Sequence, residues 1–411
     1  MPDREAEADA HPGTRAPSRS SKRGLDWFAF FVADIQTGFG PFLSVYLTTQ
    51  KWTQVDIGLV LSIGSLASLL GQVPGGWVVD QAQSKRRLAA IAVISIGVSA
   101  LLIALAPLFV TIVAAKLLHV ASSSVLGPAV AAITLGLVGH AAVGPRLGRN
   151  ARFAAFGNGL AAGVMGACGY LVSAQAVFYV TAVLAFPALL ALRQIRECDV
   201  DPVRADGGIA TCAANRGRAR LFRGRALPVL TMCVLLFHLA NSAMLPLVGS
   251  DVTMRSTQWA TALVAACIIA PQVIVAAISP GIGQFAQSWG RRPLLLIGFA
   301  ALPLRGALLA CTSDPYMIVA VQMLDGVSGA VLGVLVPLAL ADISRGTGHF
   351  NLAQGIVGSA TGIGATLSTI GAGYLADHLG TRAAFAGLAA MAVLALLVVV
   401  LLMPETKPAD E

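Results

Sequence analysis

Twelve long apolar segments constrain what this chain of 411 residues can fold into more than any other feature. An α-helix needs about 20 mainly apolar residues to cross a bilayer. Only 12% of the residues are charged, against roughly 25% in a soluble domain. The sequence therefore predicts an all-α integral membrane protein with twelve transmembrane helices. We place the segments at about 25–48, 56–79, 88–108, 110–138, 151–172, 176–195, 226–249, 258–283, 293–312, 315–341, 351–375 and 383–403.

The basic residues predict the orientation of these helices. If the N-terminus is cytosolic, 23 of the 28 Lys and Arg residues lie in the tails and loops on that side, and only Lys51, Arg255 and Arg382 lie in the opposite loops. Cytosolic loops carry such an excess. We therefore expect both termini in the cytosol of a bacterial inner membrane, with disordered tails at 1–24 and 404–411. The positive charge reflects topology, so no nucleic-acid partner is expected.

The two halves of the chain resemble each other on either side of a polar linker at 196–225. Lys116-Leu-Leu-His119 corresponds to Gln322-Met-Leu-Asp325 at an offset of 206 positions, and Gly76 corresponds to Gly283 at an offset of 207. This duplication predicts two six-helix bundles, 25–195 and 226–403, related by a pseudo-two-fold axis. Transporters built from such repeats bind substrate near the bilayer midplane, between the halves.

Each half also contains a junction where an apolar run becomes basic. The junctions are GQVPGGWVVDQAQSKRR at 71–87 and SPGIGQFAQSWGRR at 279–292. They resemble the Gly-x-x-x-Asp-Arg-x-Gly-Arg-Arg motif of the major facilitator superfamily, although Gln287 stands where the second copy would have its acid. The resemblance implies a gating role for the residues that match the motif or supply its basic cluster: Gly76, Asp80, Arg86, Arg87, Gly283, Gly290, Arg291 and Arg292. In that family the equivalent of Asp80 locks the halves together through charge and helix-dipole contacts.

Within that superfamily, the chain is most similar to drug and metabolite:proton antiporters with twelve helices. Lys116 stands where these often carry an Arg, but the glycine-rich segment 151–172 lacks their Gly-Pro step. The resemblance implies proton-coupled export of a small amphiphilic drug or metabolite by a monomer. Proton-coupled uptake of a small organic anion, suggested by Lys116 and Arg305, is the alternative. A receptor or scaffold that does not transport is a remote alternative.

No pattern in the sequence indicates an enzyme. We find no phosphate-binding Walker motif, no carboxylate pair in a polar setting, and no Cys or His cluster with metal-ligand spacing. The glycine-rich strings lie inside apolar segments, where they favour close helix packing. We therefore expect no metal and no cofactor.

Two carboxylates lie well inside apolar segments, Asp34 and Asp325. Since a charge in the bilayer is costly, such residues are candidates for function. We interpret Asp34 as a protonatable group that faces the cavity, or as a structural partner of Lys116 or Arg305. Other acids, among them Asp26, Asp80 and Asp342, lie at segment ends, where we expect water to reach them.

The remaining candidates have equally open roles. Lys116 and His119 either tune the charge around the cavity for substrate or proton coupling, or make structural contacts. Arg305 contacts an anion or forms a salt bridge with Asp325. Five polar residues either line the cavity or form hydrogen bonds between helices: Gln36, Asn158, His238, Asn241 and Gln272.

Overall fold

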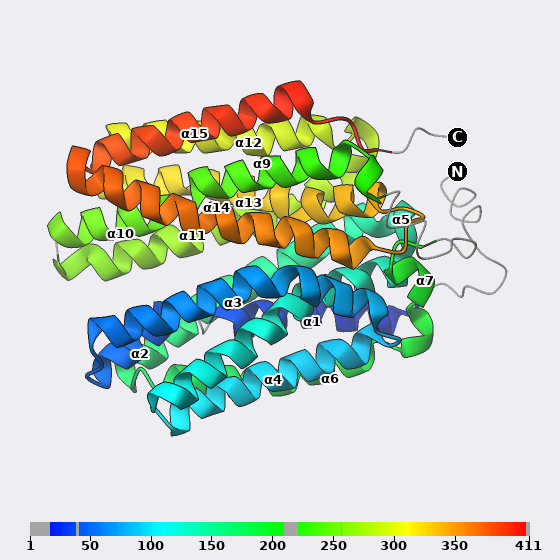
Figure 1. Cartoon of the computed structure of the whole chain (residues 1–411), viewed down its shortest axis with the longest axis horizontal. Helices are drawn as coiled ribbons and strands as arrows, with labels where there is room; N and C mark the ends of the chain where they lie inside the picture. Colours follow the sequence, from blue (N-terminus) through cyan, green and yellow to red (C-terminus); the bar gives the residue numbers. More distant parts are fainter. Residues whose placement is uncertain (1–16, 38–40, 209–220, 256, 408–411) are drawn as a thin grey trace.

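The apolar segments form helices that run back and forth along one axis (Figure 1). The computed structural model describes residues 17–37, 41–208, 221–255 and 257–407. The parts of the expected tails and linker at 1–16, 209–220 and 408–411 lie outside the described residues. Nine helical stretches in the described chain are long and apolar enough to span a membrane.

The N-terminal bundle contains six crossings. Its elements are α1 (Arg19–Thr37), α2 (Pro41–Thr49), α3 (Gln54–Gln81), α4 (Lys85–Leu105), α5 (Phe109–Leu171) and α6 (Ala176–Gln194). The first crossing combines α1 and α2. The 63 residues of α5 make two crossings, because Gly139 inside it is non-helical, with φ 70° and ψ 177°. Glycine adopts such a positive φ without steric penalty.

The C-terminal bundle repeats this arrangement and brings the total to twelve crossings, as predicted. Its elements are α9 (Ala226–Asn241), α10 (Met244–Arg255), α11 (Thr257–Trp289), α12 (Arg292–Cys311), α13 (Pro315–Ile343), α14 (Phe350–Leu379) and α15 (Thr381–Leu402). Here α9 and α10 form one crossing. Two short elements, η2 (Glu197–Asp199) and α7 (Pro202–Ala205), lie in the linker between the bundles.

Two helices begin earlier than the hydrophobic pattern predicts. α1 starts at Arg19 instead of residue 25, and the second crossing of α5 follows Gly139 directly instead of starting near residue 151. Serine hydroxyls fix the start of α1, because Ser18 and Ser21 donate hydrogen bonds of 2.6 and 2.7 Å to Asp199. Hydropathy marks the apolar part of a helix, whereas its polar end is set by such local contacts.

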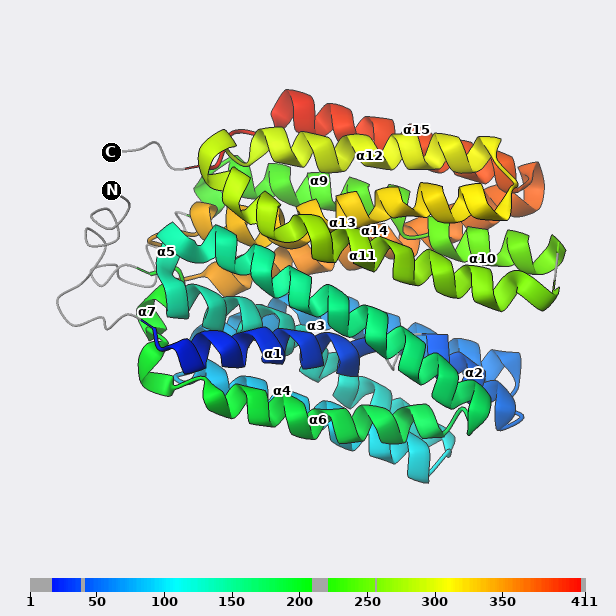
Figure 2. The ribbon, with the colours of Figure 1, turned by 180° about the vertical axis from the view of Figure 1, so that it is seen from behind.

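Each bundle has its own apolar core, and α5 connects the two. The N-terminal core includes Phe28 and Phe178, and the C-terminal core includes Phe299 and Phe385. Leu147 and other residues of α5 pack into the C-terminal core, although α5 belongs to the N-terminal bundle. The bundles converge at the end that carries both chain termini, and they diverge toward the opposite end (Figures 1 and 2). We call the first of these the terminus-side end.

Glycines allow the bundles to meet closely at the terminus-side end. A Cβ added at Gly144 of α5 would lie 2.8 Å from the carbonyl oxygen of Gly283 in α11. A Cβ at Gly283 would in turn overlap the carbonyl oxygen of Gly144. Arg152 of α5 adds a hydrogen bond of 2.8 Å from Nε to the carbonyl oxygen of Ala276. The backbones of α5 and α11 are thus in direct contact, as small residues permit between membrane helices.

We predict that Gly283→Ala separates the bundles at the terminus-side end. The added methyl group meets backbone atoms that cannot turn aside, and overpacking of this kind costs about 1–3 kcal/mol. Spin labels on cysteines that replace Gln83 and Ser288, both exposed at this end in opposite halves, should show a longer distance in this variant. Gly281→Ala is the control, because its Cβ would meet only Phe285 ring atoms at ordinary distances of 3.6 Å and more. Equal distances in the two variants would contradict the prediction.

Candidate functional site

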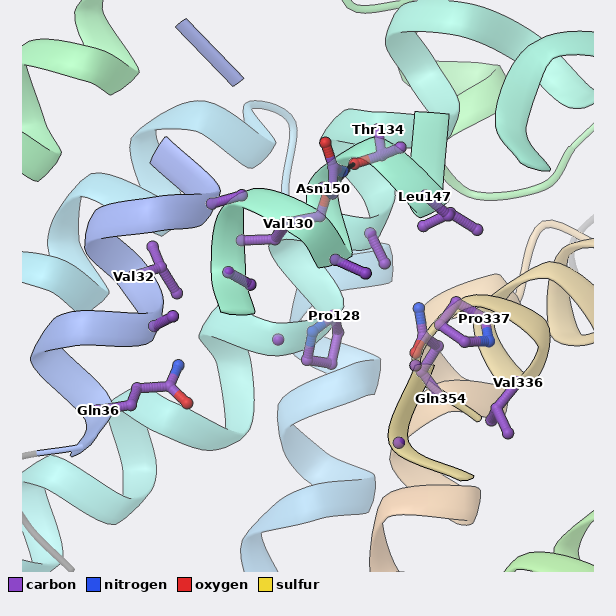
Figure 3. Close-up of a pocket in the computed structure, with 18 of the residues that line it drawn as sticks. Val32, Gln36, Pro128, Val130, Thr134, Leu147, Asn150, Val336, Pro337 and Gln354 are labelled. Carbon is purple, nitrogen blue, oxygen red and sulfur yellow. Dashed lines mark hydrogen bonds between the residues drawn. The ribbon is translucent and has the colours of Figure 1, made fainter. Parts of the chain in front are cut away.

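A cavity of about 690 Å³ lies between the two bundles. Its walls come from α1, α3 and α5 of one half and from α11, α13 and α14 of the other. Figure 3 shows Gln36 and Val32 of α1 on one side and Gln354 and Pro337 on the other. The volume lies within the roughly 300–1,000 Å³ of small-molecule sites. The cavity therefore has the position and size of a substrate site in a two-bundle transporter.

The lining is uncharged and mostly apolar, with several neutral polar groups. Among the described residues that line the cavity, none is Asp, Glu, Lys, Arg or His. The polar members carry amide or hydroxyl groups: Gln36, Gln72, Thr134, Asn150, Asn158, Gln272, Gln354 and Thr361. Amides both donate and accept hydrogen bonds. With the aliphatic remainder of the wall, they suit a small molecule that has an apolar body and neutral hydrogen-bonding groups.

Two of these amides differ in how far the protein satisfies them. Asn150 donates to Thr134 Oγ1 at 2.8 Å and accepts from Arg146 Nε at 3.0 Å, so its position is fixed (Figure 3). The Nε2 atom of Gln354 is buried and has no hydrogen-bond partner among the described residues. A buried donor without a partner costs about 1–3 kcal/mol. An acceptor on a bound molecule would remove that penalty, so Gln354 is suited to contact substrate.

Gln36, Asn158 and Gln272 are the candidate residues from the sequence that lie in the described lining. On the helix of Gln36, the residues Ala29, Val32 and Ala33 also face the cavity. Asp34 follows directly after Ala33 but is only 2% exposed and lies outside the lining. Within the described part of the chain, its Oδ1 atom has no hydrogen-bond partner. The structure thus places this carboxylate beside the cavity instead of facing into it.

Arg305 and Asp325 form a salt bridge, which was one of the two interpretations of Arg305 from the sequence. Nη1 of Arg305 lies 2.5 Å from Asp325 Oδ1. The same guanidinium donates to Asn241 Oδ1 at 2.5 Å and to Gln322 Oε1 at 2.8 Å. These contacts join α9, α12 and α13 within the C-terminal half, and Arg305 is 1% exposed. The guanidinium therefore holds helices together, and it does not pair with Asp34.

The other three candidates also lie outside the described cavity lining. Lys116 of α5 packs on Gly64 of α3, where an added Cβ would lie 2.6 Å from its Cε. His119 Nε2 lies 3.4 Å from the hydroxyl of Ser123, one turn further along α5. The His238 ring packs edge-on against Phe237, with centroids 5.4 Å apart. Hydropathy locates such residues along a helix but does not give its rotation.

The first basic junction connects the two halves through Asp80. Oδ1 of Asp80, at the end of α3, accepts hydrogen bonds from Asn351 N at 3.0 Å and from Asn351 Nδ2 at 2.8 Å. Oδ2 accepts from Leu352 N at 2.9 Å. These backbone groups lie in the first turn of α14, whose partial positive charge attracts an anion. Gly76 permits this approach, because a Cβ there would overlap the carbonyl oxygen of Asn351.

Lys85 and Asp206 complete this junction, although we did not predict a role for either. Lys85 is buried and donates to the carbonyl oxygens of Val79 at 2.6 Å and Ala82 at 2.8 Å. Its Nζ also lies 2.7 Å from Oδ1 of Asp206 in the linker. Burial raises the pKa of Asp206 to about 7, although Lys85 opposes this shift. The carboxylate therefore gains a proton as the pH falls below about 7, and the ion pair is then lost.

The linker thereby becomes part of the contact between the halves. Phe350 N donates to the carbonyl oxygen of Asp206 at 3.1 Å, and Gly346 N donates to that of Gly207 at 2.6 Å. Arg86 donates to Ile195 O at 2.9 Å, and Arg87 is 3.9 Å from Glu197. The two arginines thus secure the linker to the N-terminal bundle and do not reach across. In the sequence, only the spacing of the polar residues in 199–208 could have suggested that the linker packs between the halves. That spacing matches no known motif.

The second basic junction makes its charged contacts within its own half. Arg291 donates from Nε to Asp342 Oδ2 at 2.9 Å and from its backbone to Glu405 Oε1 at 2.9 Å. Arg292 N donates to the same carboxylate at 3.1 Å. Gly290, with φ 91°, lies against Glu405. Across the interface, Gln287 donates one exposed hydrogen bond of 2.5 Å to the carbonyl oxygen of Ala141.

The acids at segment ends are less accessible than we expected. Asp26 is 2% exposed, because Arg146 binds one of its oxygens at 2.6 Å and Arg149 binds the carboxylate through two nitrogens at 2.8 and 2.7 Å. The side chains of Asp80 and Asp342 are likewise buried. The expectation that water reaches these three residues was wrong. Each lies where neighbouring helices bring cations or free N–H groups to it.

Comparison with known proteins agrees with this architecture. The sequence profile of the Major Facilitator Superfamily matches residues 27–207 and 230–411. Uncharacterized MFS-type transporters from two strains of Mycobacterium tuberculosis are 38% identical over 396 residues, which cover 94% of this chain and 94% of theirs.

Two crystal structures share the fold at low sequence identity. The human organic anion transporter MFSD10 (TETRAN) is 14% identical with a TM-score of 0.71, and the match covers 95% of this chain and all of that one. A mutant of the nucleoside transporter NupG is 16% identical with a TM-score of 0.66, covering 93% of this chain and all of that one. At these identities the likeness shows the fold alone.

We predict that Asp80→Asn opens the terminus-side end. The asparagine keeps one acceptor oxygen but loses the charge that α14 attracts, and a hydrogen bond to a charged group contributes about 1.5–3 kcal/mol. The spin-label distance between positions 83 and 288 should therefore lengthen. Gln287→Ala should change it little, because it removes one exposed neutral hydrogen bond. An equal shift in both variants would count against a special role for Asp80.

We predict that Asp325→Asn lowers stability sharply, because it leaves the buried guanidinium of Arg305 without a counter-charge. Breaking a buried ion pair in this way costs about 3–5 kcal/mol. Thermal unfolding of the purified protein in detergent measures the loss. Asp377→Asn, an exposed acid on α14, is the control and should unfold near the wild-type temperature. An Asp325→Asn variant as stable as this control would show that the ion pair is dispensable.

Proposed function

This chain belongs to the major facilitator superfamily, and we propose that it is a proton-coupled transporter that exports a small amphiphilic drug or metabolite. In this proposal the two bundles rock against each other around the central cavity, which binds the substrate. Membrane transport is the function of the family. The direction, the coupling ion and the substrate class are our inferences from the residues.

The uncharged, amide-rich cavity is the observation that carries the substrate class. A permanently charged molecule binds more favourably where an opposite charge is close by, because burial of an unpaired charge is costly. The described lining offers amides, hydroxyls and aliphatic groups. Neutral or weakly charged compounds with hydrogen-bonding groups therefore fit best. Nucleosides, after which one of the two fold neighbours is named, belong to this chemical class and should be included in any substrate screen.

The cavity chemistry does not favour the alternative, uptake of an organic anion. That hypothesis depended on Lys116 and Arg305, and neither lines the cavity. Arg305 is already neutralised by Asp325. Although the human organic anion transporter shares the fold, an anion in the described cavity would meet no cationic side chain of the described lining.

Asp34 is the residue that we propose for proton coupling. It is the buried carboxylate nearest in sequence to the cavity wall, one position after the lining residue Ala33. An acid that is stabilised by a salt bridge would resist changes in protonation. No described cation lies within ion-pair distance of Asp34, and one of its oxygens has no hydrogen-bond partner among the described residues. Proton uptake and release at this position thus break no ion pair.

The distribution of basic residues supports a cytosolic terminus-side end. With that orientation, the contacts of Asp80, Gly144 and Gly283 close the cytosolic side, and the described conformation is outward-facing. A bacterial inner membrane is the proposed location, in keeping with mycobacterial relatives. Export would then require opening of this junction to admit substrate from the cytosol.

The substrate is best sought with purified protein before any transport assay. A thermal-shift screen against metabolites and drugs, repeated at two pH values, identifies compounds that bind. Proteoliposomes then distinguish the mechanisms, because antiport moves protons opposite to the compound and symport moves them with it. A receptor or scaffold would bind a compound but show no flux. Co-movement of protons and compound would overturn the export proposal.

We predict that Asp34→Asn retains the fold but loses transport driven by a pH gradient. Its unfolding temperature should stay at or above that of wild type, because the substitution removes a buried carboxylate whose Oδ1 has no hydrogen-bond partner in the described chain. Transport of the screened compound should fall to the level of protein-free liposomes. Asp377→Asn serves as the charge-matched control. Full gradient-driven transport by Asp34→Asn would exclude this residue as the coupling acid.

A further inference from the structure

A second hollow, of about 490 Å³, lies where α1 and α5 meet at the terminus-side end. It is separate from the central cavity, with which it shares no described lining residue. Five basic side chains line it: Arg19, Lys22, Arg23, Arg146 and Arg149. The remaining described lining residues are the single acid Asp26 and the aromatic residues Trp27 and Phe153. The hollow is thus strongly cationic, and neither the transport cavity nor the junction uses it.

Asp26 fixes two of the cations in place. Arg146 and Arg149 bind its two oxygens at 2.6–2.8 Å. Arg149 also lies over the ring of Phe153, 5.6 Å from the centroid. The buried carboxylate neutralises one charge and holds both guanidinium groups at one wall of the hollow. An anion that enters would meet these donors already oriented, which lowers the entropic cost of binding.

The other three cations come from the start of α1. Positions 19, 22 and 23 are spaced three and four apart, so they lie on one face of the helix. All three side chains are exposed, and none forms an ion pair with a described residue. Side chains of like charge on one helix face repel one another. Nothing in the described structure offsets this repulsion, so the group is available for an external anion.

The neighbouring surface is apolar and aromatic. Trp27 is 40% exposed, and its ring stacks on Phe31 at 6.1 Å and contacts Phe153 at 6.0 Å. α1 and α5 lie side by side in the N-terminal bundle, with α5 next to α11 of the other bundle (Figure 2). Tryptophan is enriched at the level of lipid headgroups. The cations therefore lie where a membrane helix leaves the hydrocarbon region, with an apolar surface directly below them.

We propose that this hollow binds the phosphodiester headgroup of an anionic phospholipid. Arg146 and Arg149 contact the phosphate from one wall, and Arg19, Lys22 and Arg23 surround it from the other. The acyl chains lie on the aromatic surface around Trp27. Basic pockets between helices recognise anionic headgroups in this way. A soluble phosphate would use the same charges but would gain nothing from the aromatic surface.

Titration of the purified full-length protein with lipid tests this assignment. In detergent, phosphatidylglycerol should raise the apparent melting temperature in a saturable manner, whereas phosphatidylcholine should not. Each basic group near an anionic lipid strengthens binding roughly fivefold. The triple variant Arg19→Gln, Lys22→Gln, Arg23→Gln should therefore bind phosphatidylglycerol on the order of 100-fold more weakly at low salt. Native mass spectrometry should show the same loss as a missing bound lipid.

A second triple variant provides the matched control. Arg193→Gln, Arg223→Gln, Arg225→Gln also removes three exposed basic side chains outside this hollow. It should bind phosphatidylglycerol like wild type. Equal loss in both triple variants would mean non-specific attraction and would overturn the proposal. A similar stabilisation by inorganic phosphate alone would also overturn the proposal, because it would identify a soluble anion as the ligand. A similar stabilisation by phosphatidylcholine would overturn it as well, because it would exclude recognition of the lipid's charge.

Discussion

Most of the charges that the described chain buries among its helices have a partner nearby, and Asp34 is the exception on which the proposed function rests. Burial of an unpaired charge is far more costly than burial of a satisfied one. Asp26 has two arginines, Asp342 has Arg291, and Arg305 has Asp325 together with two amides. Asp80 differs because its partners are backbone N–H groups at the start of a helix in the other half. The first three sets stabilise a single bundle, whereas the contacts of Asp80 depend on how the bundles are placed relative to each other.

The two basic junctions have diverged into different tasks, although they began as copies. In the first, the acid reaches across to α14, and Lys85 brings the linker into the same contact. In the second, a glutamine occupies the position of the acid, and the arginines are used to fasten α12 to α13 and to the segment after α15. The first junction therefore makes a charged contact across the interface, whereas the second makes its charged contacts within its own half. The near-symmetry of the fold does not extend to its electrostatics.

The sequence was sufficient for the fold and much less so for the site. Twelve crossings in two bundles follow from segment length and hydrophobicity, which act on each helix separately. The cavity depends on helix rotation, which hydropathy does not contain. Among the candidates from the sequence, Gln36, Asn158 and Gln272 lie in the described lining, whereas Arg305 lies in the core of its own bundle. The neutral residues Gln354 and Asn150 were missed because an amide inside a helix gives no distinctive signal. Asp206 was missed because a polar linker looks the same whether or not it packs between the bundles.

The glycine contacts between α5 and α11 have a consequence for how the bundles separate. Gly144 and Gly283 meet through their backbones, so no side chains interlock between these two residues. We therefore expect the polar contacts around Asp80, at the same end, to resist separation of the bundles more than the contact between Gly144 and Gly283 does.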